Sequence, residues 1–378
     1  MGKLRVVHLY LHLDFGGIES AICGLLPRLN REEFDARMIC TQRRGVLAAG
    51  LERQGIRVDV CRLHSTLLNS LSALRLARKL RMIGADVVHA HGEFTAQVAT
   101  VAARKASVPI VVANFHGVGL FKRRRQLERE RRQACMRDAV IHVSQRAHED
   151  YLERVRPSSD NGVVIHNGID TGFFAQPRGE ERLRELALEL GVAERGPVLL
   201  NVARMHRDKN QAVLLEAFRE VLERYPAATL LLVGRGRRRA EIEGIIRALD
   251  LHDSVRILEA RTDVGDLYHL ADLGVLASNR EGFSIVVLEA MAAGLPQVLT
   301  DVGGNGEAVG DTRAALLVPP RDSHSLAAAL LQLLDDPDRA REMRRAARKR
   351  AMRFSVEGQV ARTERLYREL ALRVGLES

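Results

Sequence analysis

Residues 273–300 read LGVLASNREGFSIVVLEAMAAGLPQVLT, and their pattern is that of a strand, a helix and a second strand. The short apolar run 273–277 predicts the first strand, and 297–300 predicts the second. Between them, a Gly-Phe-Ser turn opens an apolar run that ends at Gly294, as expected of a helix. This order is typical of a parallel sheet with helices packed on its faces.

The same alternation extends along the whole chain. The continuous apolar run 230–233 favours sheets that are buried on both faces. The fold class predicted is therefore α/β, with two doubly wound parallel sheets. The expected strands are 4–11, 36–41, 57–61, 86–91, 110–113, 139–143 and 163–165 in the first half, and 197–202, 229–233, 255–258, 273–277, 297–300 and 315–318 in the second.

The length of 378 residues exceeds one ordinary core and fits two domains. Glycines and a proline interrupt the pattern at 167–170 and 177–179, which indicates the domain boundary. We expect domains 1–177 and 178–355, followed by a long terminal helix. In that helical tail, Asp336-Pro337-Asp338 is interpreted as a helix cap, not as a metal motif.

Composition limits the classes of partner. The net charge is +10, so anionic lipid, an anionic substrate and nucleic acid all fit the charge. The absence of tryptophan and an aromatic content of 4% disfavour base stacking, and no nucleic acid is expected. No apolar run is long enough to span a membrane, no signal peptide is supported, and four unpaired cysteines fit a cytoplasmic protein.

The segment after Ser278 has the features of a phosphate and hydroxyl site. Glu281 precedes the helix, Ser284 is expected to cap it, and the free N–H groups of residues 284–286 attract phosphate. Glu289 falls one turn inside, where a carboxylate accepts hydrogen bonds from paired hydroxyls such as those of ribose. These features together predict a nucleotide-sugar pocket.

Two further segments follow strands and suit phosphate. Arg204 and Lys209 combine a planar guanidinium with a point charge, which suits a diphosphate; solvated surface charges are the alternative. Gly16 and Gly17 open a helix after the first strand and allow close approach of a ligand, although a tight structural turn explains them equally well.

Three histidines lie near expected strand ends: His89, His91 and His116. Three interpretations are open, namely a zinc site, contact with substrate or nucleotide, and interior histidines with satisfied hydrogen bonds. Their spacing matches no familiar zinc site, so no metal is expected.

Taken together, these motifs resemble the retaining GT-B glycosyltransferases of the glycosyltransferase family 4, or group 1, type. They occur in the family's order and cover almost the entire chain. The matching segments are Gly16 to Glu19, His89 to Gly92, Phe115 to Gly117, Val164 to Asp170, Arg204 with Lys209, Glu281 to Gly294, and Gly303-Gly304 with Glu307.

The resemblance implies two Rossmann-like domains that face an interdomain cleft, with the terminal helix 356–378 returning to the first domain. It also implies that donor binding requires no metal and no cofactor. The residues it implies as catalytic are His116, Arg204, Lys209 and Glu281; those it implies as donor-binding are Gly16, Gly17, Arg204, Lys209, Glu281, Gly282, Phe283, Ser284, Ile285, Val286 and Glu289.

By this resemblance, the expected reaction moves a hexose or related sugar from a UDP- or GDP-linked donor to a saccharide or lipid-linked acceptor, in cell-surface polysaccharide or glycolipid synthesis. The basic segment 121–132 suggests attachment to the anionic cytoplasmic face of a membrane, or contact with an anionic acceptor. The alternatives are a nucleotide-sugar epimerase or hydrolase on the same fold, and a non-catalytic protein that binds sugar or nucleic acid.

Overall fold

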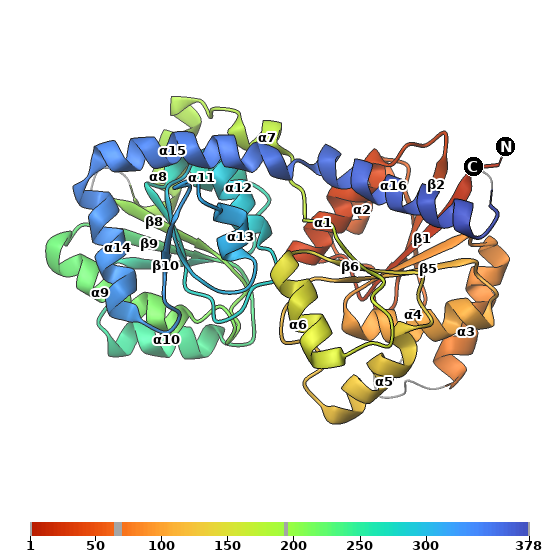
Figure 1. The fold of residues 1–378 in the computed structure, drawn as a ribbon. Helices are drawn as coiled ribbons and strands as arrows, with labels where there is room; N and C mark the ends of the chain where they lie inside the picture. Colours follow the sequence, from red (N-terminus) through yellow and green to blue (C-terminus); the bar gives the residue numbers. More distant parts are fainter. Residues whose placement is uncertain (1, 64–69, 193–195, 377–378) are drawn as a thin grey trace. The chain divides into compact units, whose positions relative to one another are not determined.

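The computed structural model describes residues 2–63, 70–192 and 196–376. The chain divides into two compact units (Figure 1). Unit 1 comprises Met1–Gly168 together with Val356–Ser378, and unit 2 comprises Ile169–Ser355. The unit boundary falls inside the 167–170 turn. Unit 2 starts before the expected residue 178 because helix α7 packs there, with the ring of Phe174 edge-on to Tyr268 at 6.0 Å.

Unit 1 is built on a seven-stranded parallel sheet of order β3-β2-β1-β4-β5-β6-β7. Its strands are β1 (Leu4–Tyr10), β2 (Phe34–Cys40), β3 (Arg57–Val60), β4 (Val87–His91), β5 (Ile110–Phe115), β6 (Ala139–His142) and β7 (Gly162–Val164). Its helices are α1 (Gly17–Leu25), η1 (Leu26–Arg28), α2 (Ala48–Arg53), α3 (Ser70–Ile83), α4 (Glu93–Lys105), α5 (Arg124–Ala134), α6 (Gln145–Val155) and α16 (Val356–Arg373).

The two faces of this sheet are covered by different helices. Alternate residues of β1 point to opposite layers, so Val6 packs with α1, α2 and α16 while Val7 packs with α3, α4 and α6. Tyr367 of the terminal helix α16 is fully buried in the first layer. The last helix of the chain is therefore part of the core of unit 1.

Unit 2 contains a six-stranded parallel sheet of order β10-β9-β8-β11-β12-β13. Its strands are β8 (Val198–Val202), β9 (Thr229–Val233), β10 (Val255–Leu258), β11 (Leu273–Leu276), β12 (Gln297–Thr300) and β13 (Leu316–Val318). Its helices are α7 (Thr171–Ala175), α8 (Glu180–Leu190), α9 (Gln211–Arg224), α10 (Arg239–Ala248), α11 (Val264–Leu270), α12 (Ile285–Ala293), α13 (Asn305–Val309), α14 (Ser323–Asp335), α15 (Pro337–Ala351) and η2 (Met352–Phe354).

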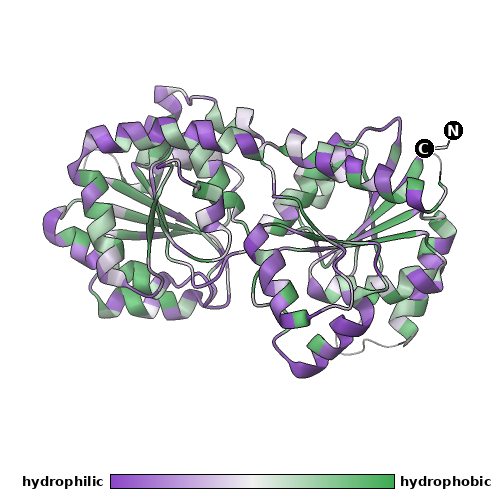
Figure 2. Cartoon of the chain, in the orientation of Figure 1, coloured by the Kyte–Doolittle hydropathy of each residue, from purple (hydrophilic) through white to green (hydrophobic). Residues whose placement is uncertain are grey.

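Both faces of the second sheet are also covered. Helices α9, α10 and α14 share one apolar layer, and α8, α11 and α12 share the other. The strands are coloured mostly hydrophobic in Figure 2, whereas α5 of unit 1 is coloured hydrophilic along most of its length. Two doubly wound parallel sheets confirm the predicted fold class. Among the described residues, no helix combines the length and apolar character needed to cross a membrane.

Each sheet has one point where the strand order reverses. In unit 1 this point lies between β1 and β4, and in unit 2 it lies between β8 and β11. The loops that leave the carboxyl ends of two such strands diverge to opposite faces and leave a crevice, which is where open α/β sheets bind ligands. The predicted functional residues of unit 2 lie in the loops after β8 and β11 and in helix α12, which follows the second loop.

Candidate active site

The loops after β8 and β11 are fastened to each other in unit 2. The Arg280 guanidinium donates to both carboxylate oxygens of Asp208, at 2.7 and 2.8 Å. The backbone N–H of Asn279 donates to the carbonyl of Asp208 at 2.7 Å. The two loops therefore form one rigid wall at the strand-order reversal.

An ion pair also joins these two loops. The Lys209 ammonium group donates to Oε1 of Glu281, which also accepts a hydrogen bond from the Ser278 hydroxyl at 2.5 Å. The side chains of Lys209 and Glu281 are 17% and 8% exposed, so this pair is shielded from most solvent. Because an ammonium group has three donors, Lys209 can hold Glu281 and still donate to an anionic ligand.

Arg204 contrasts with Lys209. It is exposed, and in the described part of the chain its guanidinium has no hydrogen-bond or ion-pair partner. Its backbone is held, because the Arg204 carbonyl accepts from Gln211 Nε2 at 3.0 Å. A free, always charged fork on an anchored backbone is suited to bind a phosphate.

Helix α12 begins directly after Glu281. Ser284 occupies its N-cap position, but the Ser284 side chain makes no capping hydrogen bond, so that part of the prediction is wrong. The serine is buried and its hydroxyl is not directed at the first-turn amides. The N–H groups at the start of a helix have no intrahelical partner, so those of Ile285 and Val286 keep the anion-attracting character expected of them.

Gly282 and Phe283 complete the turn. The Phe283 ring is buried and stacks edge-on against Phe354 with centroids 5.1 Å apart. The ring therefore belongs to the core of unit 2, and only the backbone of this turn is available to a ligand.

Glu289 lies one turn into α12, and its carboxyl accepts a hydrogen bond from the Tyr268 hydroxyl at 2.9 Å. Burial raises the pKa of Glu289 to about 7, although the bond from Tyr268 acts in the opposite direction. Burial and the Glu289 carboxyl raise the pKa of the Tyr268 hydroxyl, which stays a donor. Tyr268 thus orients an acid that is poised between its neutral and charged forms.

Glycines allow the neighbouring loops to approach this wall. A Cβ atom on Gly303, whose φ is +55°, would lie 1.7 Å from the carbonyl oxygen of Glu281. A Cβ atom on Gly234 would lie 2.1 Å from the carbonyl oxygen of Ala203. Gly303 follows β12 and lies against the loop after β11, and Gly234 follows β9 and lies against the loop after β8.

In unit 1, Gly16 and Gly17 start α1 after β1. A Cβ atom on Gly16 would lie 2.4 Å from a carboxylate oxygen of Glu19, so the end of the Glu19 side chain would have to move aside. A Cβ atom on Gly17 would meet nothing within 4 Å. Packing does not require the second glycine, and the open space beside it is compatible with a bound ligand.

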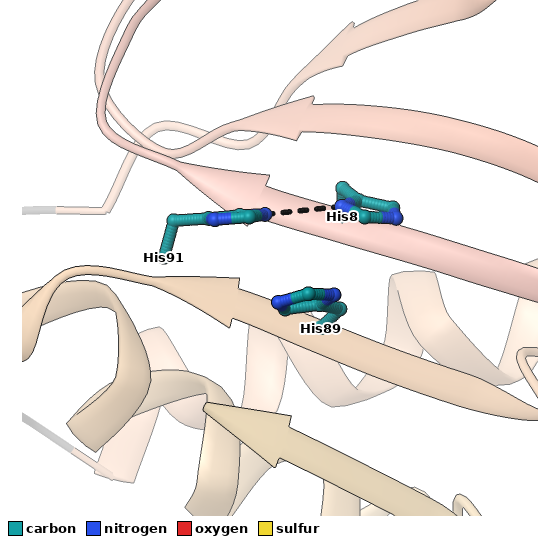
Figure 3. A group of neighbouring side chains, drawn as sticks. All are labelled: His8, His89 and His91. Atoms are coloured by element: carbon teal, nitrogen blue, oxygen red, sulfur yellow. Dashed lines mark hydrogen bonds between the residues drawn. The ribbon is translucent and has the colours of Figure 1, made fainter. Parts of the chain in front are cut away.

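The third predicted segment of unit 1 contains His116, which follows β5 and is partly buried. Its Nε2 lies 3.2 Å from Nδ1 of His91. His89 and His91 are 1% and 2% exposed, and His91 in turn contacts His8 of β1 (Figure 3). Of the three interpretations of His89 and His91, the structure favours hydrogen-bonded interior histidines.

The structure thus joins Lys209 to Glu281 and places Arg204 in the same loop as Lys209, with Glu289 one helical turn beyond. Sequence reasoning missed the side chains that hold this arrangement, namely Ser278, Arg280, Asp208 and Tyr268. Ser278 and Arg280 adjoin Glu281 in sequence, so their position was a usable signal. Tyr268 had no local signal, because only the packing of α11 on α12 brings it to Glu289.

Comparison with known proteins is consistent with this geometry. Residues 181–350 match the family model "Glycosyl transferases group 1", and residues 15–173 match "Glycosyltransferase Family 4". A D-inositol 3-phosphate glycosyltransferase of Corynebacterium aurimucosum is 31% identical over 301 residues, with 75% of this chain and 71% of that protein covered. The UDP-Gal:alpha-D-GlcNAc-diphosphoundecaprenol alpha-1,3-galactosyltransferase of Escherichia coli is 26% identical over 88% of this chain and 89% of its own length.

Solved structures show the same fold. Anabaena HepE in complex with UDP and glucose has a TM-score of 0.86 at 22% identity, with 97% of this chain and 100% of that chain covered. Sucrose-phosphate synthase from Thermosynechococcus elongatus has a TM-score of 0.82 at 22% identity, with 98% and 100% covered. The chain therefore belongs to the glycosyltransferases of the family 4, group 1 type, and is a transferase enzyme with the GT-B fold.

Proposed function

We propose that this glycosyltransferase moves a hexose or related sugar from a UDP- or GDP-linked donor, with retention of anomeric configuration, to a saccharide or lipid-linked acceptor. The observation that carries the proposal is the arrangement at the strand-order reversal of unit 2. There the Arg204 guanidinium, which has no partner among the described residues, and the Lys209–Glu281 pair lie in two adjoining loops, and α12 begins at the end of the second loop. Two cations and a helix N-terminus together match the charge of a diphosphate.

Each donor group has a chemical counterpart in this arrangement. Arg204 and Lys209 would hold the diphosphate, and the carboxyl of Glu289 would accept the ribose hydroxyls. Glu281 and the backbone of residues 282–286 would hold the transferred sugar. In unit 1, Gly16 and Gly17 would leave room for the phosphates, and His116 would contact the reacting sugar.

The proposed reaction breaks the bond between the anomeric carbon and the oxygen of the β-phosphate. The acceptor oxygen forms the new bond on the same face, and its proton passes to the departing phosphate. Negative charge develops on that phosphate, so the cations Arg204 and Lys209 supply the main stabilisation of the transition state. The charges of this chain suffice for that role, and we propose a reaction independent of metal and cofactor.

The names of the relatives support the choice of donor and acceptor. The Escherichia coli relative uses UDP-Gal and an acceptor linked to diphosphoundecaprenol, and HepE was solved with UDP and glucose. We therefore favour a UDP-sugar donor and a lipid-linked saccharide acceptor, in the synthesis of a cell-surface polysaccharide or glycolipid at the cytoplasmic face of a membrane.

The basic segment 121–132 supports the membrane part of the proposal. Lys122, Arg123 and Arg125 are exposed at the start of α5. We expect cosedimentation with vesicles that contain anionic lipid at low salt, and its loss at high salt. The variant Arg123→Glu/Arg125→Glu should abolish this binding, whereas Arg237→Glu, an exposed change in unit 2, should not. Absence of binding by the parent protein at low salt would exclude membrane attachment.

The donor is tested by thermal shift against UDP-, GDP- and ADP-sugars, followed by product analysis with the donor that binds. A ligand that binds the folded protein stabilises it by an amount that grows with the logarithm of the ratio of ligand concentration to Kd, and so raises the melting temperature. We expect a shift with a UDP- or GDP-sugar, and a product that retains the donor's anomeric configuration by NMR. An inverted product would refute the proposed mechanism, and an epimerised or hydrolysed sugar formed at full rate without acceptor would refute the proposed reaction.

A further inference from the structure

Four histidines and one tyrosine form a polar group in unit 1, inside the apolar layer that α1, α2 and α16 cover; four of the five side chains are buried, and His116 is partly buried. His8 lies in the middle of β1, and His89 and His91 lie on the same face of the adjacent strand β4 (Figure 3). The side chain of Tyr367 reaches this layer from α16, and His116 adjoins it after β5. His8, His89 and Tyr367 are at most 1% exposed, so bulk water cannot satisfy their polar atoms.

Hydrogen bonds join these five side chains in one continuous chain. Its first link runs from His116 Nε2 to His91 Nδ1 at 3.2 Å, and its second from His91 Nε2 to His8 Nδ1 at 3.0 Å. The third runs from His8 Nε2 to the Tyr367 hydroxyl at 3.3 Å, and the last from that hydroxyl to His89 Nδ1 at 2.6 Å. Each internal imidazole therefore uses both of its ring nitrogens.

Two ring nitrogens have no partner among the described residues, and they lie at the two ends of this hydrogen-bonded chain. Nδ1 of His116 and Nε2 of His89 are buried and have no hydrogen-bond partner among the described residues. Burial lowers the pKa of His8 and of His116 to about 3, and burial lowers the pKa values of His89 and His91 well below the usual value. All four imidazoles are neutral at pH 7, so each has one donor and one acceptor nitrogen.

The Tyr367 hydroxyl is buried and its two partners in this chain are His8 and His89, so its proton must be donated to one of them. With that condition, this inventory permits only two arrangements of protons. If His116 donates from Nε2, then His91 and His8 must also donate from Nε2, and the Tyr367 hydroxyl donates to His89. If every bond is reversed, His89 donates from Nδ1 to the Tyr367 oxygen, and His8, His91 and His116 likewise carry the proton on Nδ1. A ring of the opposite tautomer would place two donors or two lone pairs in the same link, or would leave the buried Tyr367 O–H without an acceptor.

We propose that His8 and Tyr367 are positioning residues for His116, because they belong to a hydrogen-bonded chain in which all four imidazoles carry the proton on the same ring nitrogen. The tautomer of His116 is then set jointly by the whole chain. In this way, the direction in which the Tyr367 hydroxyl on α16 donates is coupled to whether Nδ1 of His116 donates or accepts.

The same cluster also brings one nitrogen each from His8, His89 and His91 within 4.8 Å of one another, as a metal site would require. The ring planes disfavour that reading. The rings of His89 and His91 are stacked, with centroids 4.4 Å apart and planes 16° apart, so their lone pairs lie in two nearly parallel planes and do not converge on one ion. His8 and His91 are in addition already hydrogen-bonded to each other.

The consequence for catalysis rests on the proposed function, since only that function gives His116 a sugar to contact. A sugar hydroxyl that reached the buried Nδ1 of His116 would donate to it in one arrangement and accept from it in the other. The claim that all four imidazoles carry the proton on the same ring nitrogen, here called the tautomer rule, concerns the free protein. It can therefore fail while the transferase proposal stands, and it can hold if no donor binds.

The rule is tested by histidine ring ¹H–¹⁵N correlation spectra of the free, ¹⁵N-labelled full chain at pH 7. Single variants such as His116→Gln assign the signals by loss of one ring. We expect the four rings to show the same tautomer. Two different tautomers among the four would overturn the proposal, as would rings that bind added Zn²⁺ at one ion per chain.

A variant extends the test to the role of Tyr367. Tyr367→Phe removes one hydroxyl, and we expect the ¹⁵N shifts of His116 to change although His116 lies two imidazoles away from Tyr367. Tyr151→Phe is the matched control in unit 1, because its buried hydroxyl bonds to Glu130 at 2.9 Å and lies outside the chain. Unchanged His116 signals in a folded Tyr367→Phe protein would overturn the positioning role.

The kinetic readout separates positioning from general destabilisation. We expect Tyr367→Phe to lower kcat several-fold with the donor identified above, and Tyr151→Phe to leave kcat unchanged at a temperature where both proteins are folded. If both variants lower kcat equally, the effect of Tyr367 is structural and its positioning role is refuted, whereas the parent spectrum still decides the tautomer rule.

Discussion

Glu289 gives the most quantitative test of the unit 2 site. Burial raises the pKa of its carboxyl from 4.5 to about 7. An acid whose pKa is higher in the folded than in the unfolded protein binds more protons when folded, so its contribution to stability is greatest at low pH and is lost as pH rises between these two values. We therefore expect Glu289 to destabilise the folded protein increasingly from about pH 4.5 to 7.

The size of the effect follows from the pKa difference. A rise from 4.5 to about 7 corresponds to about 3 kcal/mol between the two ends of that range. The variant Glu289→Gln keeps an acceptor for the Tyr268 hydroxyl but cannot ionise. Its unfolding free energy, relative to the parent, should therefore increase by about 3 kcal/mol from pH 4.5 to pH 8.

The assay is chemical denaturation of both proteins across this pH range, followed by the difference between them at each pH. Glu216→Gln is the control, because Glu216 is an exposed glutamate on α9 of the same unit. A difference between parent and Glu289→Gln that does not vary with pH would refute the raised pKa and the burial that causes it. The same result in Glu216→Gln would show that the effect is not specific to the buried site.

Two further substitutions test the contacts of Glu281 with the neighbouring loops of unit 2. Lys209→Met leaves the Glu281 carboxylate without its cation, so the unfolding free energy should fall by about 2–3 kcal/mol. The double variant Lys209→Met/Glu281→Gln should recover part of this loss. If the losses of the two single variants are additive in a double-mutant cycle, the ion pair is contradicted. Gly303→Ala should lower the unfolding free energy by about 1–3 kcal/mol because of the positive φ of residue 303, and by more because its Cβ atom would meet the Glu281 carbonyl. The control is Gly244→Ala within α10, which should leave stability unchanged or increase it. Thermal unfolding of both variants measures the difference.

Sequence patterns predicted the framework because buried strands depend on local composition. The expected strands at 229–233, 255–258 and 297–300 coincide with β9, β10 and β12. β5 extends two residues beyond the expected end at 113. Polar Asn114 remains in the strand because its side-chain amide donates to the carbonyl of Ile141, at 3.2 Å, and is therefore satisfied inside the sheet. A composition rule cannot detect such a partner.

Helix ends show the same division between local and distant causes. Asp336 caps α15 as predicted, because its carboxylate accepts from the N–H of Arg339, three residues later, at 2.9 Å. Ser284 has an equally suitable type and position, yet its side chain forms no cap. The buried turn of which it is part is shaped by Phe354, 70 residues further along, whose ring packs against Phe283.

For the same reason, the candidate site could be predicted only in part from the sequence. Arg204, Lys209, Glu281 and Glu289 are identifiable by motif, since their spacing follows strands and a helix start. The role of His8 was not predicted, because a single histidine in an apolar strand gives no sign that its neighbours are His91 and, through α16, Tyr367. Such partnerships follow from sheet order and helix packing, which a linear pattern does not encode.

The central claim is that the two cations of unit 2 bind the diphosphate of the donor. It is tested most directly by calorimetric titration of the parent and of Arg204→Ala with UDP, or GDP if that is the nucleotide bound, and with the matching nucleoside. We predict that Arg204→Ala weakens binding of the diphosphate by about 10- to 100-fold, since a hydrogen bond to a charged group contributes about 1.5–3 kcal/mol, and leaves nucleoside binding unchanged. Equal affinity of the parent and Arg204→Ala for the diphosphate would contradict the account.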